Sequence, residues 1–77
     1  MSRPNERPDW ASGPEWEGWQ EWPRGVYRSC PQLSFVIYAI GGMAIHDEQS
    51  EIEITTDSPQ AALAAANALA EACGGWE

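Results

Sequence analysis

Two stretches in the middle of the chain have side-chain patterns typical of strands: the first is apolar on both faces, and the second alternates apolar and polar residues. Residues 33–40 are rich in β-branched and aromatic side chains, which predicts a strand. Phe35 and Ile37 would lie on one face of this strand and Val36 on the other. Because both faces are apolar, we expect the strand to be central and covered on both sides. A short strand over residues 26–28 would precede it.

The second stretch covers residues 51–56, where apolar and polar side chains alternate. Ile52 and Ile54 are expected to point into the core. The positions between them would face water or a partner, and these are Glu51, Glu53 and Thr55. The pattern is typical of a strand with one buried face and one open face.

The connection between these two strands has two interpretations. In the first, Gly41 and Gly42 form a two-residue hairpin turn, residues 43–45 return beside the preceding strand, and residues 46–50 form a polar loop. In the second, residues 35–45 are one long bent strand with a bulge at the two glycines, and residues 46–50 are the hairpin loop. The sequence does not separate these alternatives.

An alanine-rich helix is predicted over residues 58–73. Asp57 or Ser58 would cap its start, Pro59 suits its first turn, and Gly74–Gly75 would end it. At about 100° per residue, one face of this helix is apolar and mostly small. Its residues are Ala62, Leu63, Ala66, Leu69, Ala70 and Cys73. Such a face lets the helix lie close to a sheet.

The segment 1–24 differs from the rest in being rich in tryptophan and proline. We expect the segment 1–8 to be a flexible arm. Pro14 and Pro23 would bound a helix of about two turns, on which tryptophans at every third position form a stripe. These tryptophans are Trp16, Trp19 and Trp22. The alternative is an extended segment that carries the same tryptophans across the sheet.

Together these elements predict an α+β fold. We expect a small antiparallel sheet of about three strands, with the C-terminal helix on one face and the Trp-rich segment near the other. A chain of 77 residues is long enough for one small domain. We place that domain at residues 25–77 and treat residues 1–24 as a partly flexible Trp/Pro-rich arm.

Charge is divided unevenly along the chain. The formal net charge is −8, and there is no lysine. No arginine lies beyond Arg28, and the others are Arg3, Arg7 and Arg24. The acids that follow Arg28 therefore have no cation near them in sequence. They must face water, bind a cation or meet a basic partner. Such a charge repels nucleic acid and anionic membranes, so we expect neither as a direct partner.

No targeting or membrane-spanning segment is predicted. The N-terminus has no apolar stretch of the kind found in secretory signals, and the longest apolar run, residues 35–45, is too short for a spanning helix. We therefore expect a cytoplasmic protein. Cys30 and Cys73 are then expected to be free thiols, with Cys73 buried and Cys30 half-exposed.

The chain offers little that resembles catalytic chemistry. His46, Asp47 and Glu48 form the one cluster of the right residue types, but a zinc site needs three or four converging ligands and there is no second histidine. Phosphate-binding glycine motifs are absent. We predict no enzyme activity, no cofactor and no metal.

Two groups of residues are candidate binding residues. The tryptophans Trp16, Trp19 and Trp22 are potential interface anchors, because a large rigid ring buries much area at little entropic cost. The competing interpretation is that at least two of the N-terminal tryptophans fill the core. The second group is an acidic row made up of Asp47, Glu48, Glu51, Glu53 and Asp57.

The acidic row also has two interpretations. It is either a solvated sheet edge, protected against aggregation, or a surface that imitates nucleic-acid phosphates and docks on a cationic site. Carboxylates two apart on a strand are roughly 6.5–7 Å from each other, which is close to phosphate spacing, although any alternating acidic strand has this property.

The high content of alanine, glycine, proline and tryptophan, with arginine and no lysine, is typical of a GC-rich coding genome. In composition the chain resembles small acidic accessory proteins of actinobacterial phages. The segments that carry the resemblance are residues 15–22 and 58–70. It implies a viral, non-enzymatic protein that acts in the host cytoplasm on a host factor such as a polymerase, a nuclease or a defence complex. No functional residue is carried over from it.

The sequence therefore predicts a non-catalytic protein-interaction module. It would bind a basic protein that handles nucleic acid. As an inhibitor or nucleic-acid mimic, it would block that protein. Steering by the acidic strand would precede anchoring by tryptophan. One alternative is a self-associating accessory protein that forms a homodimer through a sheet edge and the tryptophans. Another is a neutraliser of a basic toxin.

Overall fold

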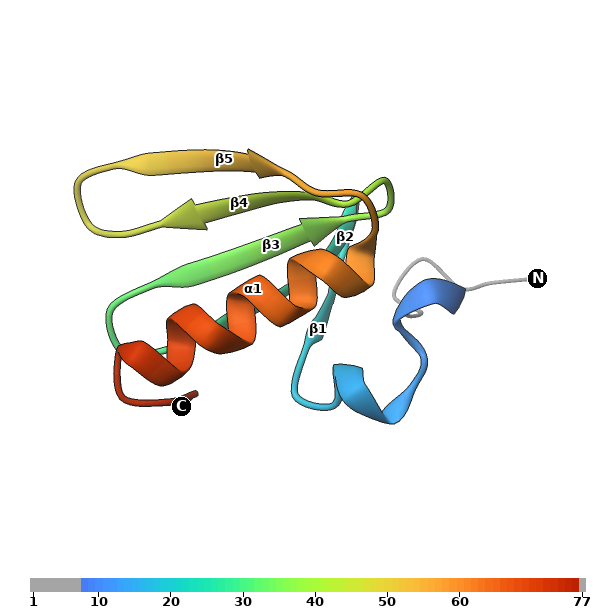
Figure 1. The fold of residues 1–77 in the computed structure, drawn as a ribbon, viewed down its shortest axis with the longest axis horizontal. Helices are drawn as coiled ribbons and strands as arrows, with labels where there is room; N and C mark the ends of the chain where they lie inside the picture. The colour runs from blue at the N-terminus through green and yellow to red at the C-terminus, as the bar shows by residue number, and fades with distance from the viewer. Residues whose placement is uncertain (1–7, 77) are drawn as a thin grey trace.

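The computed structural model describes residues 8–76, which form a five-stranded antiparallel sheet with one α-helix against it (Figure 1). The elements in chain order are the 3-10 turns η1 (Asp9–Ala11) and η2 (Pro14–Trp16), the strands β1 (Gln20–Trp22), β2 (Gly25–Ser29), β3 (Ser34–Tyr38), β4 (Gly42–His46) and β5 (Glu51–Thr55), and the helix α1 (Pro59–Ala72). The α+β fold and the C-terminal helix are as predicted.

The strands are paired in sequence order, each antiparallel to the next. The expectation of about three strands was too low. Strand β1 was not among the predicted strands. It lies where a two-turn helix was favoured, and only the alternative of an extended segment allowed for it. Gly18 has a φ of +91° and follows η2, so the chain leaves the helical conformation before β1. A two-residue turn, Pro23–Arg24, then connects β1 to β2, and Trp22 pairs with Gly25 across it.

The hairpin between β3 and β4 resolves the alternatives at the two glycines. Its loop is Ala39–Gly41, and Gly42 already belongs to β4. Gly41 has a φ of +95°, and its amide donates to the carbonyl of Tyr38 at 3.0 Å, as in a three-residue hairpin loop with glycine at the left-handed position. The hairpin interpretation is confirmed with its turn shifted toward β3, and the single bent strand is wrong.

Helix α1 begins and ends as its caps predict. The Ser58 hydroxyl accepts a hydrogen bond from the amide of Ala61 at 3.2 Å, which satisfies one of the free donors of the first turn. At the other end Gly74 and Gly75 have positive φ, and the Gly75 amide donates to the carbonyl of Ala70 at 2.7 Å. This pairing, with glycine in the left-handed conformation, terminates the helix.

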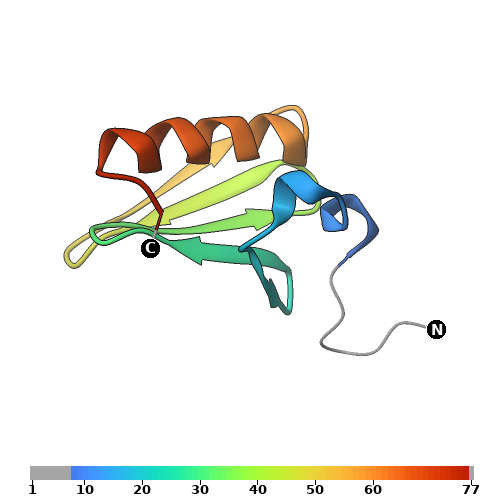
Figure 2. The same ribbon diagram turned by 90° about the horizontal axis from the view of Figure 1, so that it is seen from below.

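The core lies on one side of the sheet, under α1. Central side chains of β2, β3 and β4 meet the small face of the helix there, and Trp16 and Trp19 belong to the same buried cluster. Figure 2 shows α1 and η2 on the same side of the sheet. The expectation that the Trp-rich segment lies near the opposite face is therefore wrong. The reason is volume, because a helix face made mostly of alanine leaves space beside it that the indole rings fill.

Strand β3 is central, as predicted, but only one of its faces is covered by another element among the described residues. Phe35 and Ile37 pack under α1, whereas Val36 points to the opposite side. Val36 is nevertheless buried, and its cross-strand neighbours are Tyr27 and Ala44. On the predicted helix face, Leu69 is an exception, because it is 38% exposed.

The predicted division after Arg24 falls within the turn between β1 and β2. Ala11, Trp16 and Trp19 are core residues, and β1 is part of the sheet. The described part of the segment 1–24 therefore packs into the same unit as the rest. The predicted flexible arm lies outside the described residues, apart from Pro8.

Candidate functional site

The candidate tryptophans fall into two environments. Trp16 and Trp19 are fully buried, so they are core residues and not exposed anchors, and the interpretation that at least two N-terminal tryptophans fill the core is confirmed. Their rings belong to an edge-to-face series with centroid separations of 5.3–5.9 Å. The series runs through Trp10, Trp16, Trp19, Trp76 and Phe35. Such pairs stabilise a core beyond the area they bury.

Arg28 lies over one ring of this aromatic series, that of Trp76. Its guanidinium carbon is 4.5 Å from the centre of the Trp76 ring, and its Nη1 donates to the carbonyl of Glu17 at 3.1 Å. Trp76 is also held by its indole nitrogen, which donates to Oδ1 of Asn67 at 3.1 Å. The arginine therefore stabilises the C-terminal tryptophan on the core side of the sheet and is not part of the opposite face.

Trp22 is different, because its side chain is 41% exposed and lies on the other face of the sheet. In an antiparallel pair, opposite residues point to the same side. Trp22 pairs with Gly25, and Gly25 pairs with Tyr38, which is adjacent to the core residue Ile37 and therefore points away from the core. Of the three predicted anchors, Trp22 is the one that the fold leaves accessible.

Glu51 and Glu53 reach this same face from the opposite edge. Glu53 pairs with Ala44, and Ala44 lies beside Val36. Ile52 and Ile54 point to the helix side of the sheet. Ile54 packs against the core as predicted, whereas Ile52 is 58% exposed, so its predicted place in the core is wrong. Trp22 and Glu53, which are far apart in sequence, thus share one side of the sheet.

The other acids of the row extend beyond the strand. Asp47 and Glu48 lie in the loop between β4 and β5, and Asp57 lies between β5 and α1. All of them are exposed. The row therefore runs from one end of β5 to the other, with its middle on the sheet face.

Asp47 has a local structural role within its loop. Its Oδ1 accepts hydrogen bonds from the amides of Gln49 (2.8 Å) and Ser50 (2.7 Å), and the hydroxyl of Ser50 lies 3.2 Å away. The backbone amides of Gln49 and Ser50 lower the pKa of Asp47 from its ordinary value of 3.8. Asp47 therefore stabilises the turn, and its Oδ1 is already occupied by hydrogen bonds within the loop.

His46 faces Glu51 across β4 and β5, with His46 Nδ1 3.7 Å from Glu51 Oε1. Within residues 8–76, no three histidine, cysteine or carboxylate side chains are close enough to hold a metal ion. The cluster of residues 46–48 is thus a sheet end and a loop.

We call the uncovered side of the sheet the open face. Figure 2 shows α1 on the other side, and no helix or strand within residues 8–76 covers this one. Its residues are Gln20, Trp22, Tyr27, Ser29, Ser34, Val36, Tyr38, Gly42, Ala44, His46, Glu51, Glu53 and Thr55. The open face is aromatic toward β1, small and apolar in the middle, and acidic at β5.

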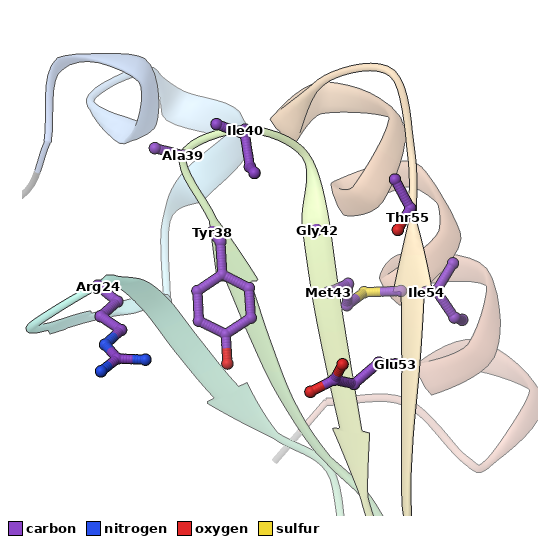
Figure 3. Close-up of a pocket in the computed structure, with 9 residues that line it drawn as sticks. All are labelled: Arg24, Tyr38, Ala39, Ile40, Gly42, Met43, Glu53, Ile54 and Thr55. Carbon is purple, nitrogen blue, oxygen red and sulfur yellow. The ribbon is translucent and has the colours of Figure 1, made fainter.

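A groove of about 470 Å³ crosses one end of the open face (Figure 3). Gly42 forms its floor, since it has no side chain, and Tyr38 and Glu53 stand on either side of it. Figure 3 shows the Glu53 carboxylate extending across β4 toward the side of Tyr38, whose ring points along the strand, with Arg24 beyond Tyr38. The groove is open to solvent and presents hydrogen-bonding groups of both charges.

Sequence reasoning did not include four residues of this face and its groove among the candidates: Arg24, Tyr27, Tyr38 and Gly42. The signal for Tyr38 was present, because its alternation with Ile37 places it with Val36. No local signal marked Arg24 or Gly42, since their positions depend on the pairing of strands around them.

Both cysteines are free, as expected. Cys30 is buried and Cys73 is half-buried against the core. The predicted exposures were therefore wrong for both. Cys30 lies two residues after Arg28, which pairs with the core residue Phe35, so alternation places Cys30 on the core side, and its amide donates to the carbonyl of Leu33 at 2.8 Å.

Within residues 8–76 there is no helix with the length and hydrophobicity needed to cross a membrane. Comparison with protein-family models, with curated protein sequences and with solved structures finds no match to this chain.

Proposed function

We propose that the chain is a non-catalytic protein-interaction module whose open face binds a basic surface of another protein. The observation that carries this proposal is the placement of Trp22 and of Glu51 and Glu53 on one uncovered side of the sheet. An exposed tryptophan supplies buried area on binding, and the acids supply charge.

Charge complementarity supports the choice of a basic partner. Between Ser29 and Trp76 there is no lysine or arginine to neutralise Glu51 and Glu53. In this part of the sheet, His46 Nδ1 lies 3.7 Å from Glu51 Oε1. A partner with arginines or lysines would neutralise these charges. Steering by such charges raises the association rate more than the final affinity.

The size of the open face favours a modest affinity. Five strands spaced about 4.8 Å apart give the face a width of roughly 19 Å. Strands of five residues, with a rise of about 3.4 Å per residue, give it a length of roughly 17 Å. A contact limited to this face is smaller than a standard protein–protein interface. We therefore expect a complex that is sensitive to salt and depends on a few anchors.

The partner class follows from the same chemistry. Proteins that handle nucleic acid carry cationic surfaces that neutralise phosphates, and the open face would compete for them. The composition resembles that of actinobacterial phage accessory proteins, and we propose on this basis a host nucleic-acid-handling protein as the partner and its inhibition as the outcome. Neutralisation of a basic toxin would use the same face.

The homodimer hypothesis has less support from the geometry. It required exposed tryptophans, and Trp16 and Trp19 are buried. Two chains of net charge −8 also repel one another.

Binding to a basic twelve-residue peptide of alternating arginine and glycine tests the proposal. Glu51→Lys and Glu53→Lys should each lower its affinity by about tenfold or more. The matched control is Glu71→Lys, which changes the net charge equally but lies on the solvent side of α1. A lysine there also suits the helix C-terminus, so the fold should tolerate it.

The proposal fails if Glu71→Lys weakens binding as much as Glu53→Lys does. Equal losses would mean that the peptide responds to net charge and not to the open face. It also fails if raising the salt concentration from about 0.05 M to about 0.5 M leaves the affinity unchanged, because exposed charge pairs are screened over this range.

A further inference from the structure

The outer edge of β5 (Glu51–Thr55) has no strand beside it within the described residues. Hydrogen bonds at the two ends of the β4–β5 pair establish which groups face outward. The amide of Asp47 donates to the carbonyl of Ser50, and the amide of Thr56 donates to the carbonyl of Gly41, both at 3.0 Å. Because bonded and non-bonded pairs alternate in an antiparallel ladder, Ile52 and Ile54 bond to β4. The peptide groups of Glu51, Glu53 and Thr55 therefore point to the open edge.

Two exposed apolar side chains lie on the helix side of the sheet. Ile52 is 58% exposed and Leu69 is 38% exposed. Asn67 holds Trp76 on the flank of α1 nearer to Phe35. Leu69 lies on the opposite flank from Asn67, since each residue of an α-helix turns by about 100°, and this flank faces β5. The helix packs across β3 and β4 and leaves Ile52 uncovered.

Apart from its two glutamates, the edge lacks the usual obstacles to strand addition. It is five residues long and contains no proline or lysine, and its register with β4 is continuous without a bulge. The opposite edge of the sheet differs, because β1 has three residues and is followed at once by Pro23. Of the two edges, β5 is the better template for a further strand.

The charges on β5 discriminate between possible occupants. A second copy pairing antiparallel about Glu53 would place two identical carboxylates directly opposite each other, which destabilises the pair. A strand with arginine or lysine at every second position would instead place cations opposite Glu51 and Glu53. Its intervening apolar residues would cover Ile52 and Leu69 on the helix side.

We propose that β5 binds an extended segment of the partner as a sixth strand, and that this segment alternates basic and apolar residues. The inference rests on the proposed function, since it specifies the conformation and pattern of the basic partner. Main-chain hydrogen bonds to Glu51, Glu53 and Thr55 would supply part of the affinity, and the alternating side chains would supply the specificity.

The probe is a capped synthetic peptide of sequence Gly-Thr-Arg-Val-Arg-Val-Thr-Gly. Its control, Gly-Thr-Val-Val-Arg-Arg-Thr-Gly, has the same composition and charge without the alternation. Amide hydrogen exchange of the full chain is followed by NMR. At saturation with the alternating peptide, exchange of the outward amides of Glu53 and Thr55 should slow by at least about tenfold. The Ile54 amide, already bonded to β4, should change little.

A pair of variants at Thr55 tests the main-chain contact. Thr55→Pro removes an outward N–H while it keeps every acid and every hydrogen bond to β4. It should lower the affinity for the alternating peptide by about tenfold. Thr55→Val keeps the N–H and should bind as the parent chain does.

The outcomes separate this inference from the proposed function. If both peptides bind equally and the Glu53 and Thr55 amides stay unprotected, the sixth strand is overturned, while dependence on Glu51 and Glu53 would still support the open face. If neither peptide nor the alternating arginine–glycine probe binds, both proposals fail. If the two amides are already protected without peptide and lose protection on dilution, a second copy occupies the edge and the inference is overturned.

Discussion

At the scale of single residues, burial separates tryptophans that hold the fold from the one that is available for binding. Trp16 and Trp19 are enclosed by the core, and Trp76 is held by Asn67 and Arg28. Trp22 has no such enclosure among the described residues. Substitutions at Trp16 and Trp22 should therefore have different consequences.

Trp16→Ala should cost about 3–5 kcal/mol of unfolding free energy, as for other large aromatic core residues. A domain this small has only a few kcal/mol of stability, so we expect the variant to be largely unfolded. Trp22→Ala should cost about 1 kcal/mol or less and weaken binding to a basic partner protein. Thermal melts followed by circular dichroism measure the stability of both variants. Equal losses of stability would contradict the assignment of Trp22 to the surface.

Asp47 gives a prediction about pH. Its folded-state pKa lies below its ordinary value of 3.8, because backbone amides bond the ionised carboxylate. A group with a lowered folded-state pKa stabilises the fold above its unfolded-state pKa and loses that contribution as the pH falls through the folded-state pKa.

Asp47→Asn keeps an acceptor oxygen but loses the charge. In urea unfolding it should be less stable than the parent at pH 7, and the difference should shrink toward zero below about pH 4. A difference that stays constant from pH 7 to pH 3 would show that the carboxylate charge does not support the turn.

At the scale of elements, the β3–β4 hairpin depends on two adjacent glycines for different reasons. Gly41 has positive φ, and a Cβ there would lie 2.7 Å from the carbonyl oxygen of Thr56. Gly42 has no positive φ, and a Cβ there would meet only the Tyr38 ring, at 3.5 Å. Gly41 is thus required by the turn, whereas Gly42 matters because it leaves the groove open.

Gly41→Ala should destabilise the fold by about 1 kcal/mol or more. Gly42→Val should be tolerated, because a β-branched residue suits a strand and the space beside Tyr38 is free. The valine would fill the groove, so Gly42→Val should weaken binding of a basic partner protein without loss of stability. Denaturant unfolding and binding measured on the same samples test this. Unchanged binding would remove the groove from the interface.

The elements that sequence analysis predicted well have local signals. Strand β3 is rich in β-branched and aromatic residues, β5 has alternating side chains, and α1 has a serine cap, Pro59 and a glycine stop. Strand β1 had no such signal, because three residues cannot show alternation and the strand exists only through its pairing with β2. The same limit applies to the site: alternation placed Glu51 and Glu53 correctly, but only the three-dimensional fold separates Trp22 from Trp16 and Trp19.

At the scale of the whole molecule, the fold keeps its two described arginines away from the acids of β5. Arg28 is committed to Trp76 and Glu17 on the core side of the sheet. Arg24 stands at the rim of the groove, across the open face from Glu53. Within residues 8–76, the acids at β5 therefore have no arginine directly beside them, which is the electrostatic basis of the proposed function.

The central claim is that Trp22 and the acids of β5 engage the same partner through the open face. The most direct measurement is an NMR titration of the full chain with a basic partner protein, mapped on backbone amides and the indole N–H of Trp22. We predict that the Trp22 indole shifts together with amides of Tyr38, Ala44 and Glu53. Shifts confined to α1 or to the acids of residues 15–21, with the Trp22 indole unmoved, would contradict the account.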